Sequence, residues 1–201
     1  MGFEIIDISK DLLTSELYPG DPRPEVSIFS AIANGDGCNM ARISATLHCG
    51  THADAPLHFI NGGSSIGAAE LERYIGECTV LDVPPGRITG QYADEHFPRG
   101  AERLLLRSGG TAYFDKTGAE EAAYLGFKLI GTDSMSIGGS EDQTSPHRAL
   151  LGDGVAVLEN LNLNNVKPGR YFLIAPPVKI AGVDAAPVRA VLISGYMFWS
   201  N

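Results

Sequence analysis

A run of twelve residues constrains the fold of this chain more than any other feature. The run, His48-Cys-Gly-Thr-His52-Ala-Asp54-Ala-Pro-Leu-His58-Phe59, holds three of the five histidines of the protein and one carboxylate. Imidazole nitrogen and carboxylate oxygen are ligands of zinc, manganese and similar divalent ions. One such residue alone is usually an ordinary hydrogen-bonding or turn-forming side chain. Four in so short a run favour a metal site.

The spacing of the first two histidines fits a helix face, but the surrounding residues favour a strand. Gly50 lies between His48 and His52 and a proline follows, and both residue types weaken a helix. Apolar and polar residues alternate up to His48, which is the period of a strand. We therefore predict a strand over 40–48 that ends at His48. Gly50 would then turn the chain so that His52 and Asp54 return beside it.

Composition limits the classes of function. With 201 residues, of which 44% are hydrophobic, the chain can bury a sizeable core, and we expect one domain over 1–201. A net charge of −9 argues against binding to nucleic acid or to an anionic membrane surface. No leader pattern or apolar run of membrane-spanning length is present, so we expect a cytoplasmic protein. Three cysteines without paired spacing argue against a disulfide framework, and we expect Cys49 to be a buried, inert thiol.

Many short strands and few helices are expected. Strands are predicted at 3–8, 26–32, 40–48, 79–83, 103–107, 128–132, 154–158, 171–175 and 189–193. Helices are predicted at 68–75, 89–97 and 120–126, with a short fourth one from Ser145-Pro146 to Gly152. This order is not a regular βαβ series. It indicates a mixed α/β layered fold with a barrel-like central sheet.

Glu159 is the second informative residue. It follows the apolar segment Gly-Val-Ala-Val-Leu, and an ionised carboxylate entering a core is costly unless a cation compensates it. The alternative is a glutamate at a strand end that faces water. Because His147 lies twelve positions earlier, we favour metal binding. His96 lies among charged residues and is expected on a solvated surface.

The pattern His48-x-Gly-Thr-His52-x-Asp54-x-Pro-x-His58 resembles the signature of the metal-dependent cyclase-type hydrolase family. That family includes bacterial kynurenine formamidases and isatin hydrolases. Further matching segments are Ile6-Asp-Ile-Ser9, Tyr18-Pro-Gly-Asp21, Gly131-Thr-Asp133-Ser, His147, Val157-Leu-Glu159-Asn-Leu161 and Ala186-Pro-Val-Arg189. The resemblance implies a swivelling β/β/α architecture assembled as a homodimer or homotetramer.

The resemblance also implies roles for single residues. It assigns metal ligation to His48, His52, Asp54, His147 and Glu159. One or two divalent ions are implied, with zinc as the first expectation and manganese as the alternative. His58 matches the proton donor and acceptor, and Tyr18 and Phe59 are placed at the substrate. Tyr18 stands where the family's formamidases tend to have tryptophan, and the loop 136–142 lacks the Asp-Pro of those enzymes. This chain therefore differs from them at positions that are expected to recognise the substrate.

The implied function is metal-dependent hydrolysis of a small amide C–N bond. The expected substrate is a small molecule, an aryl formamide such as N-formylkynurenine, and the near alternative is the opening of a cyclic amide such as isatin. A different class is a non-catalytic metal-binding structural or sensor domain. His58 separates these classes, because a closed structural site does not need a histidine beyond its four ligands.

Overall fold

A nine-stranded sheet forms the centre of the structure, a computed structural model that describes residues 2–195. The strands lie in the order β1 (Glu4–Asp7), β13 (Val191–Ser194), β11 (Gly169–Ile174), β5 (Ile75–Asp82), β7 (Arg103–Arg107), β9 (Leu129–Thr132), β10 (Ala156–Glu159), β4 (His52–Asp54) and β12 (Ala185–Pro187). Strands β5, β7, β9 and β10 are parallel to one another. The pairs on either side of them are antiparallel, so the sheet is mixed.

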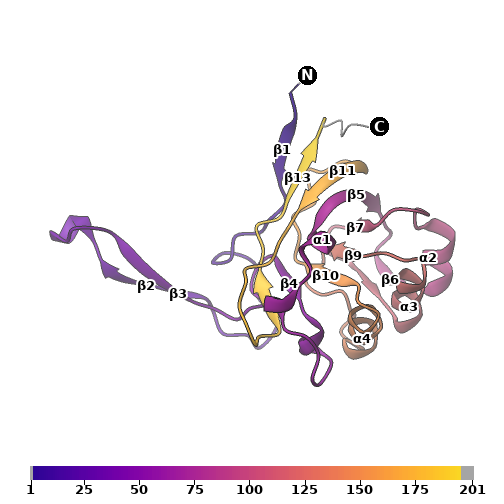
Figure 1. The fold of residues 1–201 in the computed structure, drawn as a ribbon, viewed down its shortest axis with the longest axis horizontal. Helices are drawn as coiled ribbons and strands as arrows, with labels where there is room; N and C mark the ends of the chain where they lie inside the picture. Colours follow the sequence, from indigo (N-terminus) through magenta and orange to yellow (C-terminus); the bar gives the residue numbers. More distant parts are fainter. Residues whose placement is uncertain (1, 196–201) are drawn as a thin grey trace.

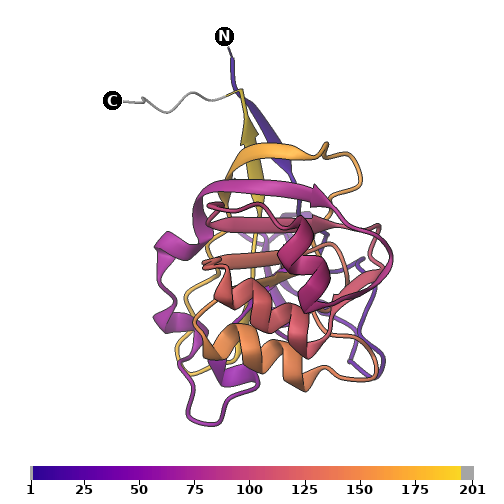
Figure 2. The same ribbon diagram turned by 90° about the vertical axis from the view of Figure 1, so that its right-hand side faces the viewer.

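The sheet curls into a half-barrel, and helices cover one of its faces. The helices of the described residues are α1 (Leu71–Tyr74), α2 (Gly90–His96), α3 (Lys116–Tyr124) and α4 (Thr144–Gly152). Figures 1 and 2 show α2, α3 and α4 together on one side of β7, β9 and β10, whereas β1 and β13 rise away from them. The expected α/β class, with a barrel-like sheet and few helices, is confirmed. No helix in the described part of the chain is both long enough and apolar enough to cross a membrane.

Side-chain alternation divides the core into two parts. On β7, Leu105 packs inside the curl of the sheet, whereas Leu104 and Leu106 pack with the helices. On β10, Leu158 belongs to the inner core and Val157 to the helix side. Because successive strand residues point to opposite faces, Glu159 shares the helix-facing side with Val157.

Strand β4 joins this arrangement by pairing antiparallel with β10. Glu159 lies opposite His52, and Val157 lies opposite Asp54. Residues directly opposite in a ladder share a face, so His52 and Asp54 point to the same side as Glu159. Ala53 lies between them and faces the inner core. The register of one strand pair therefore brings two distant sequence segments to one spot.

Two further strand pairs lie outside the central sheet. Strands β6 (Gly86–Ile88) and β8 (Ala112–Phe114) pair in parallel. Strands β2 (Glu25–Ser30) and β3 (Met40–Ser44) form an antiparallel hairpin. Figure 1 shows this hairpin, with its tip helix η1 (Ile32–Asn34), extending away from the rest of the fold as an arm.

Two predicted elements differ most from the structure, whereas the helix predicted over 120–126 begins earlier, at Lys116, and the strand predicted over 26–32 ends at Ser30. The predicted strand over 40–48 ends at Ser44, because β2 begins opposite it at Glu25 and offers no partner beyond. His48 lies instead in a turn, in which the Cys49 N–H donates to the carbonyl of Thr46. The predicted turn at Gly50 is present, with a φ of 67°.

The predicted helix over 68–75 is also wrong in extent. Only α1 is α-helical there, preceded by the short helix η3 (Ile66–Ala68). Gly76, the residue after the predicted helix, already lies in β5, with a φ of 146°. A Cβ atom at Gly76 would meet the buried guanidinium of Arg103, so close packing explains this glycine.

Candidate metal centre and active site

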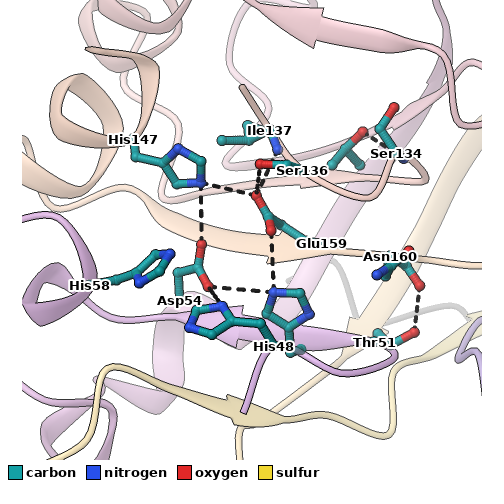
Figure 3. A network of polar contacts seen from close by, with 12 residues as sticks. His48, Thr51, Asp54, His58, Ser134, Ser136, Ile137, His147, Glu159 and Asn160 are labelled. Carbon is teal, nitrogen blue, oxygen red and sulfur yellow. Dashed lines mark hydrogen bonds and ion pairs between the residues drawn. The ribbon is translucent and has the colours of Figure 1, made fainter. Parts of the chain in front are cut away.

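His52, Asp54 and Glu159 form the centre of a buried polar cluster at the β4–β10 pair. His52 Nε2 lies 3.2 Å from Glu159 Oε2 and 3.6 Å from Asp54 Oδ1. All three side chains are nearly inaccessible to solvent. Figure 3 shows the network of contacts around the two carboxylates.

Two other segments complete the cluster. Helix α4 delivers His147, whose Nε2 lies 3.1 Å from Glu159 Oε1 and 3.5 Å from Asp54 Oδ2. The turn after β3 delivers His48, whose Nδ1 lies 3.1 Å from Asp54 Oδ1. The structure thus brings together all five residues for which the sequence predicted metal ligation.

The outer nitrogen of each of these histidines has its own acceptor. The Nδ1–H of His52 donates to the Gly50 carbonyl at 2.8 Å, and the Nδ1–H of His147 donates to the Gln143 carbonyl at 2.5 Å. The Nε2–H of His48 donates to Asp184 at 3.0 Å. The two carbonyl acceptors fix the neutral tautomers of His52 and His147, so that in the neutral form each of these rings turns an unprotonated nitrogen toward the carboxylates. Metal-binding histidines are oriented by outer partners in this way.

With these histidines neutral, the inner nitrogens of His52 and His147 have no proton to donate to the carboxylates. His52 Nε2 and both carboxylate oxygens of Asp54 are buried without a hydrogen-bond partner among the described residues. Two buried carboxylates are unfavourable unless a positive charge compensates them. Ligand atoms of His48, His52 and Asp54 lie within 4.8 Å of one another, as do those of Asp54, His58 and His147. Nitrogen and oxygen donors of this kind fit zinc or manganese.

In the metal-free protein, protons on the neighbouring histidines supply part of the positive charge that compensates the two buried carboxylates. Burial alone would lower the pKa of His48, but its close contact with Asp54 and the charges of Asp54 and Asp184 raise it to about 9. The pKa of His147 is raised against burial in the same way, to about 10, by Asp54 and Glu159. Burial and the neighbouring Asp54 charge raise the pKa of Glu159, but the close contacts with His147 and His52 outweigh them and lower it to about 2.

These shifts predict how the stability of the metal-free protein depends on pH. The folded-state pKa values of His48 and His147 exceed the unfolded value of about 6.5, so protonation stabilises the folded state. This contribution is complete below pH of about 6.5 and is lost as pH rises through about 9 to 10. We expect the Tm of chelator-treated protein to fall by several degrees between pH 6.5 and 10. A His96→Gln variant should retain this fall, and a Tm that rises over the range would contradict the shifts.

A pocket opens on one side of the cluster. Its volume is about 310 Å³, a size suited to a small molecule, and its lining includes Tyr18, His58 and Phe59. The His58 ring lies 4.1 Å from the His48 ring, centroid to centroid, and Phe59 stacks on His147 at 4.2 Å. Burial lowers the pKa of His58, so its imidazole is neutral at pH 7 and able to accept a proton.

Sequence reasoning missed three residues near the cluster. Asp184 contacts both His48 and His58 through one oxygen. Ser136 lies 3.1 Å from Glu159 Oε1 and also contacts Gln143. The only sequence signal for Asp184 was its position two residues before the matching segment that begins at Ala186.

His96 lies outside this site. It is exposed on α2, where its ring stacks on Tyr92 at 4.3 Å. The prediction that it occupies a solvated surface is confirmed. Cys49 is also placed as predicted, since it is a buried free thiol.

Comparison with known proteins gives the family. Residues 6–138 match the protein family described as "Putative cyclase". The chain is 39% identical to a kynurenine formamidase of Sphingopyxis alaskensis, covering 94% of this chain and 97% of that protein. A kynurenine formamidase of Polaromonas naphthalenivorans is also 39% identical, over 94% of this chain and 90% of that protein. The chain belongs to the cyclase family, as its sequence motifs predicted.

Solved structures agree in fold. A potential metal-dependent hydrolase with cyclase activity has a TM-score of 0.80 at 25% identity, covering 98% of this chain and 100% of that one. A predicted metal-dependent hydrolase from Bacillus stearothermophilus has a TM-score of 0.83 at 25% identity, over 96% and 99%. Isatin hydrolase A from Labrenzia aggregata has a TM-score of 0.81 at 21% identity, over 95% and 93%. At that identity the last likeness concerns the fold alone.

Proposed function

We propose that this chain is a metal-dependent amidohydrolase that cleaves the C–N bond of an aryl formamide such as N-formylkynurenine. The near full-length similarity to kynurenine formamidases supports this reaction. The observation that carries it is the position of His58. This histidine borders a small-molecule pocket beside a cluster that already offers three imidazoles and two carboxylates without it.

The five clustered residues would hold the metal. His48, His52 and Asp54 are assigned to a first ion, and His147 to a second, with the Asp54 and Glu159 carboxylates in reach of both. Zinc is the first expectation and manganese the alternative. A bound ion would supply an activated water and polarise the formyl carbonyl.

The pocket residues perform the remaining tasks. His58 accepts a proton during attack and returns it to the leaving aryl nitrogen, which is a poor leaving group until it is protonated. Phe59 and Tyr18 line the same pocket and offer aromatic surface to the aryl ring of the substrate. No protein nucleophile is needed in this scheme.

Opening of a cyclic amide such as isatin is the second candidate, because the same residues would perform it. A substrate screen separates the two. Purified protein supplied with Zn²⁺ or Mn²⁺ is expected to release formate from N-formylkynurenine and formanilide faster than it opens isatin. Faster turnover of isatin would reverse the assignment. Metal binding without turnover of any of these compounds would favour a structural or sensor domain.

The proposed cellular setting of the enzyme rests on the sequence. We propose one catalytic domain that acts in the cytoplasm on a small molecule, without a nucleic-acid or membrane partner. The net charge of −9 supports the last two points.

We also propose that the protein is a homo-oligomer, a dimer or tetramer, held by the β2–β3 arm. Cross-strand pairs place Val26, Ile28 and Ile43 on one face of the arm, and these side chains are 47%, 67% and 53% exposed. An isolated two-stranded hairpin is only marginally stable in water. A second copy of the chain that covers this apolar face would stabilise the arm.

Charged substitutions on the apolar face of the β2–β3 arm test this assembly. The variant Ile28→Asp/Ile43→Asp is expected to lower the mass measured by light scattering to that of a monomer, because burying two carboxylates opposes association. Ser27→Glu, which faces Arg42 on the other side of the hairpin, is the matched control and should keep the wild-type mass. A monomeric wild type, or an unchanged mass in the double variant, would contradict the proposal.

A further inference from the structure

One carboxylate joins the two histidines on the pocket side of the site. Asp184 Oδ2 lies 3.0 Å from His48 Nε2 and 3.3 Å from His58 Nδ1. The two imidazole rings are tilted by 32° relative to one another, with their centroids 4.1 Å apart. A single oxygen therefore faces one nitrogen of each ring.

The backbone fixes the position of Asp184. Its carbonyl accepts the N–H of Ala55 at 2.8 Å, and β12 begins at the next residue. Strand β12 pairs with β4, and Ala185 lies opposite Asp54. Asp184 is thus held by the same strand that carries the central carboxylate.

We propose that Asp184 is a positioning residue that sets the tautomer and orientation of His58. This inference rests on the proposed hydrolase function. Asp184 Oδ2, 3.3 Å from His58 Nδ1, favours the tautomer that carries its proton on Nδ1, which leaves Nε2 as the nitrogen that accepts and returns a proton. The same oxygen accepts the Nε2–H of His48 and so keeps His48 Nδ1 toward Asp54.

Asp184 is suited to this task by its surroundings. Its side chain is 40% exposed, so one part of the carboxylate is solvated while Oδ2 faces the histidines. Hydrogen bonds to a carboxylate are stronger than those to a neutral acceptor, which favours one ring orientation over the flipped one. An asparagine at this position has nearly the same shape but loses the charge, and its amide group stabilises either tautomer.

The first measurement uses Asp184→Asn without metal. Ring ¹⁵N chemical shifts of His58 report its tautomer directly. We expect the Nδ1–H form in the wild type and a mixture, or the Nε2–H form, in the variant. Metal affinity by chelator competition should weaken about 10- to 100-fold, as for other outer partners of ligating histidines.

The second measurement uses the metal-loaded enzyme and a series of formanilides. Loss of the carboxylate partner of a catalytic histidine costs up to about 10⁴ in kcat in other hydrolases. We expect at least a tenfold loss in kcat with little change in KM for unsubstituted formanilide. The loss should be smaller for p-nitroformanilide, because a less basic nitrogen depends less on protonation.

Asp7→Asn is the matched control, because Asp7 pairs with Arg189 away from the cluster. It should leave the tautomer, the affinity and the leaving-group dependence unchanged. An Asp184→Asn protein with the wild-type His58 tautomer, or with an equal rate loss for every formanilide, would overturn the proposal. If the wild type hydrolyses no formamide, the proposed function fails, and the tautomer in the metal-free protein alone decides the role of Asp184.

Discussion

Replacing His58 by alanine is expected to lower kcat about 10²- to 10⁴-fold, the range for loss of a general acid–base group. At least the metal held by His48, His52 and Asp54 should remain. His58 lies in the short helix η2 (Pro56–His58), and its ring borders the pocket beside the central carboxylates. The measurement pairs kcat on formanilide with the metal content of the same sample.

Metal content is essential in this experiment. Ligand atoms of His58, Asp54 and His147 also lie close enough to share one ion. A His58→Ala protein that has lost its metal would therefore indicate that His58 is a ligand. His96→Ala is the control, because that exposed histidine should change neither rate nor metal content beyond a small factor. A metal-replete His58→Ala enzyme within a few-fold of wild type would remove His58 from the mechanism.

Replacing Glu159 by glutamine is expected to weaken metal binding by more than about 100-fold, beyond the loss seen for outer partners of ligating residues. The amide keeps the size of the side chain but removes a negative charge that lies against both His52 and His147. Activity at limiting metal should fall in parallel. Chelator competition and elemental analysis after gel filtration measure the loss.

Glu77→Gln is the matched control for this variant. Glu77 pairs with Arg170 on the surface, and exposed pairs of this kind contribute little. It should keep wild-type affinity and activity. A Glu159→Gln protein that retains its metal through gel filtration would show that the carboxylate is not a ligand.

The sequence indicated most of the residues proposed as ligands. Those on the first segment are close in sequence, and a turn at Gly50 suffices to bring His52 and Asp54 near His48. Glu159 was found because a carboxylate at the end of an apolar strand needs compensation. The β4–β10 register then places it opposite His52. The roles of these residues and the single domain stay predictions.

The other features of the site depend on pairing between strands that are distant in sequence, which local sequence patterns do not reveal. Strand β4 has only three residues, too few to show an alternating pattern, although it carries two of the proposed ligands. The alternation of apolar and polar residues continues to His48, but β2 has no residue to pair with β3 beyond Ser44. The predicted strand over 40–48 is therefore too long. Asp184 was missed because only the pairing of β12 with β4 brings it to His48 and His58.

The most direct test of the central claim is a metal titration of stripped enzyme. Chelator-treated protein receives stepwise Zn²⁺ or Mn²⁺, and formate release from N-formylkynurenine is measured with bound metal in the same samples. We expect almost no activity without metal and a rise that saturates at one or two ions per chain. Full activity in protein shown by elemental analysis to be metal-free would contradict the account.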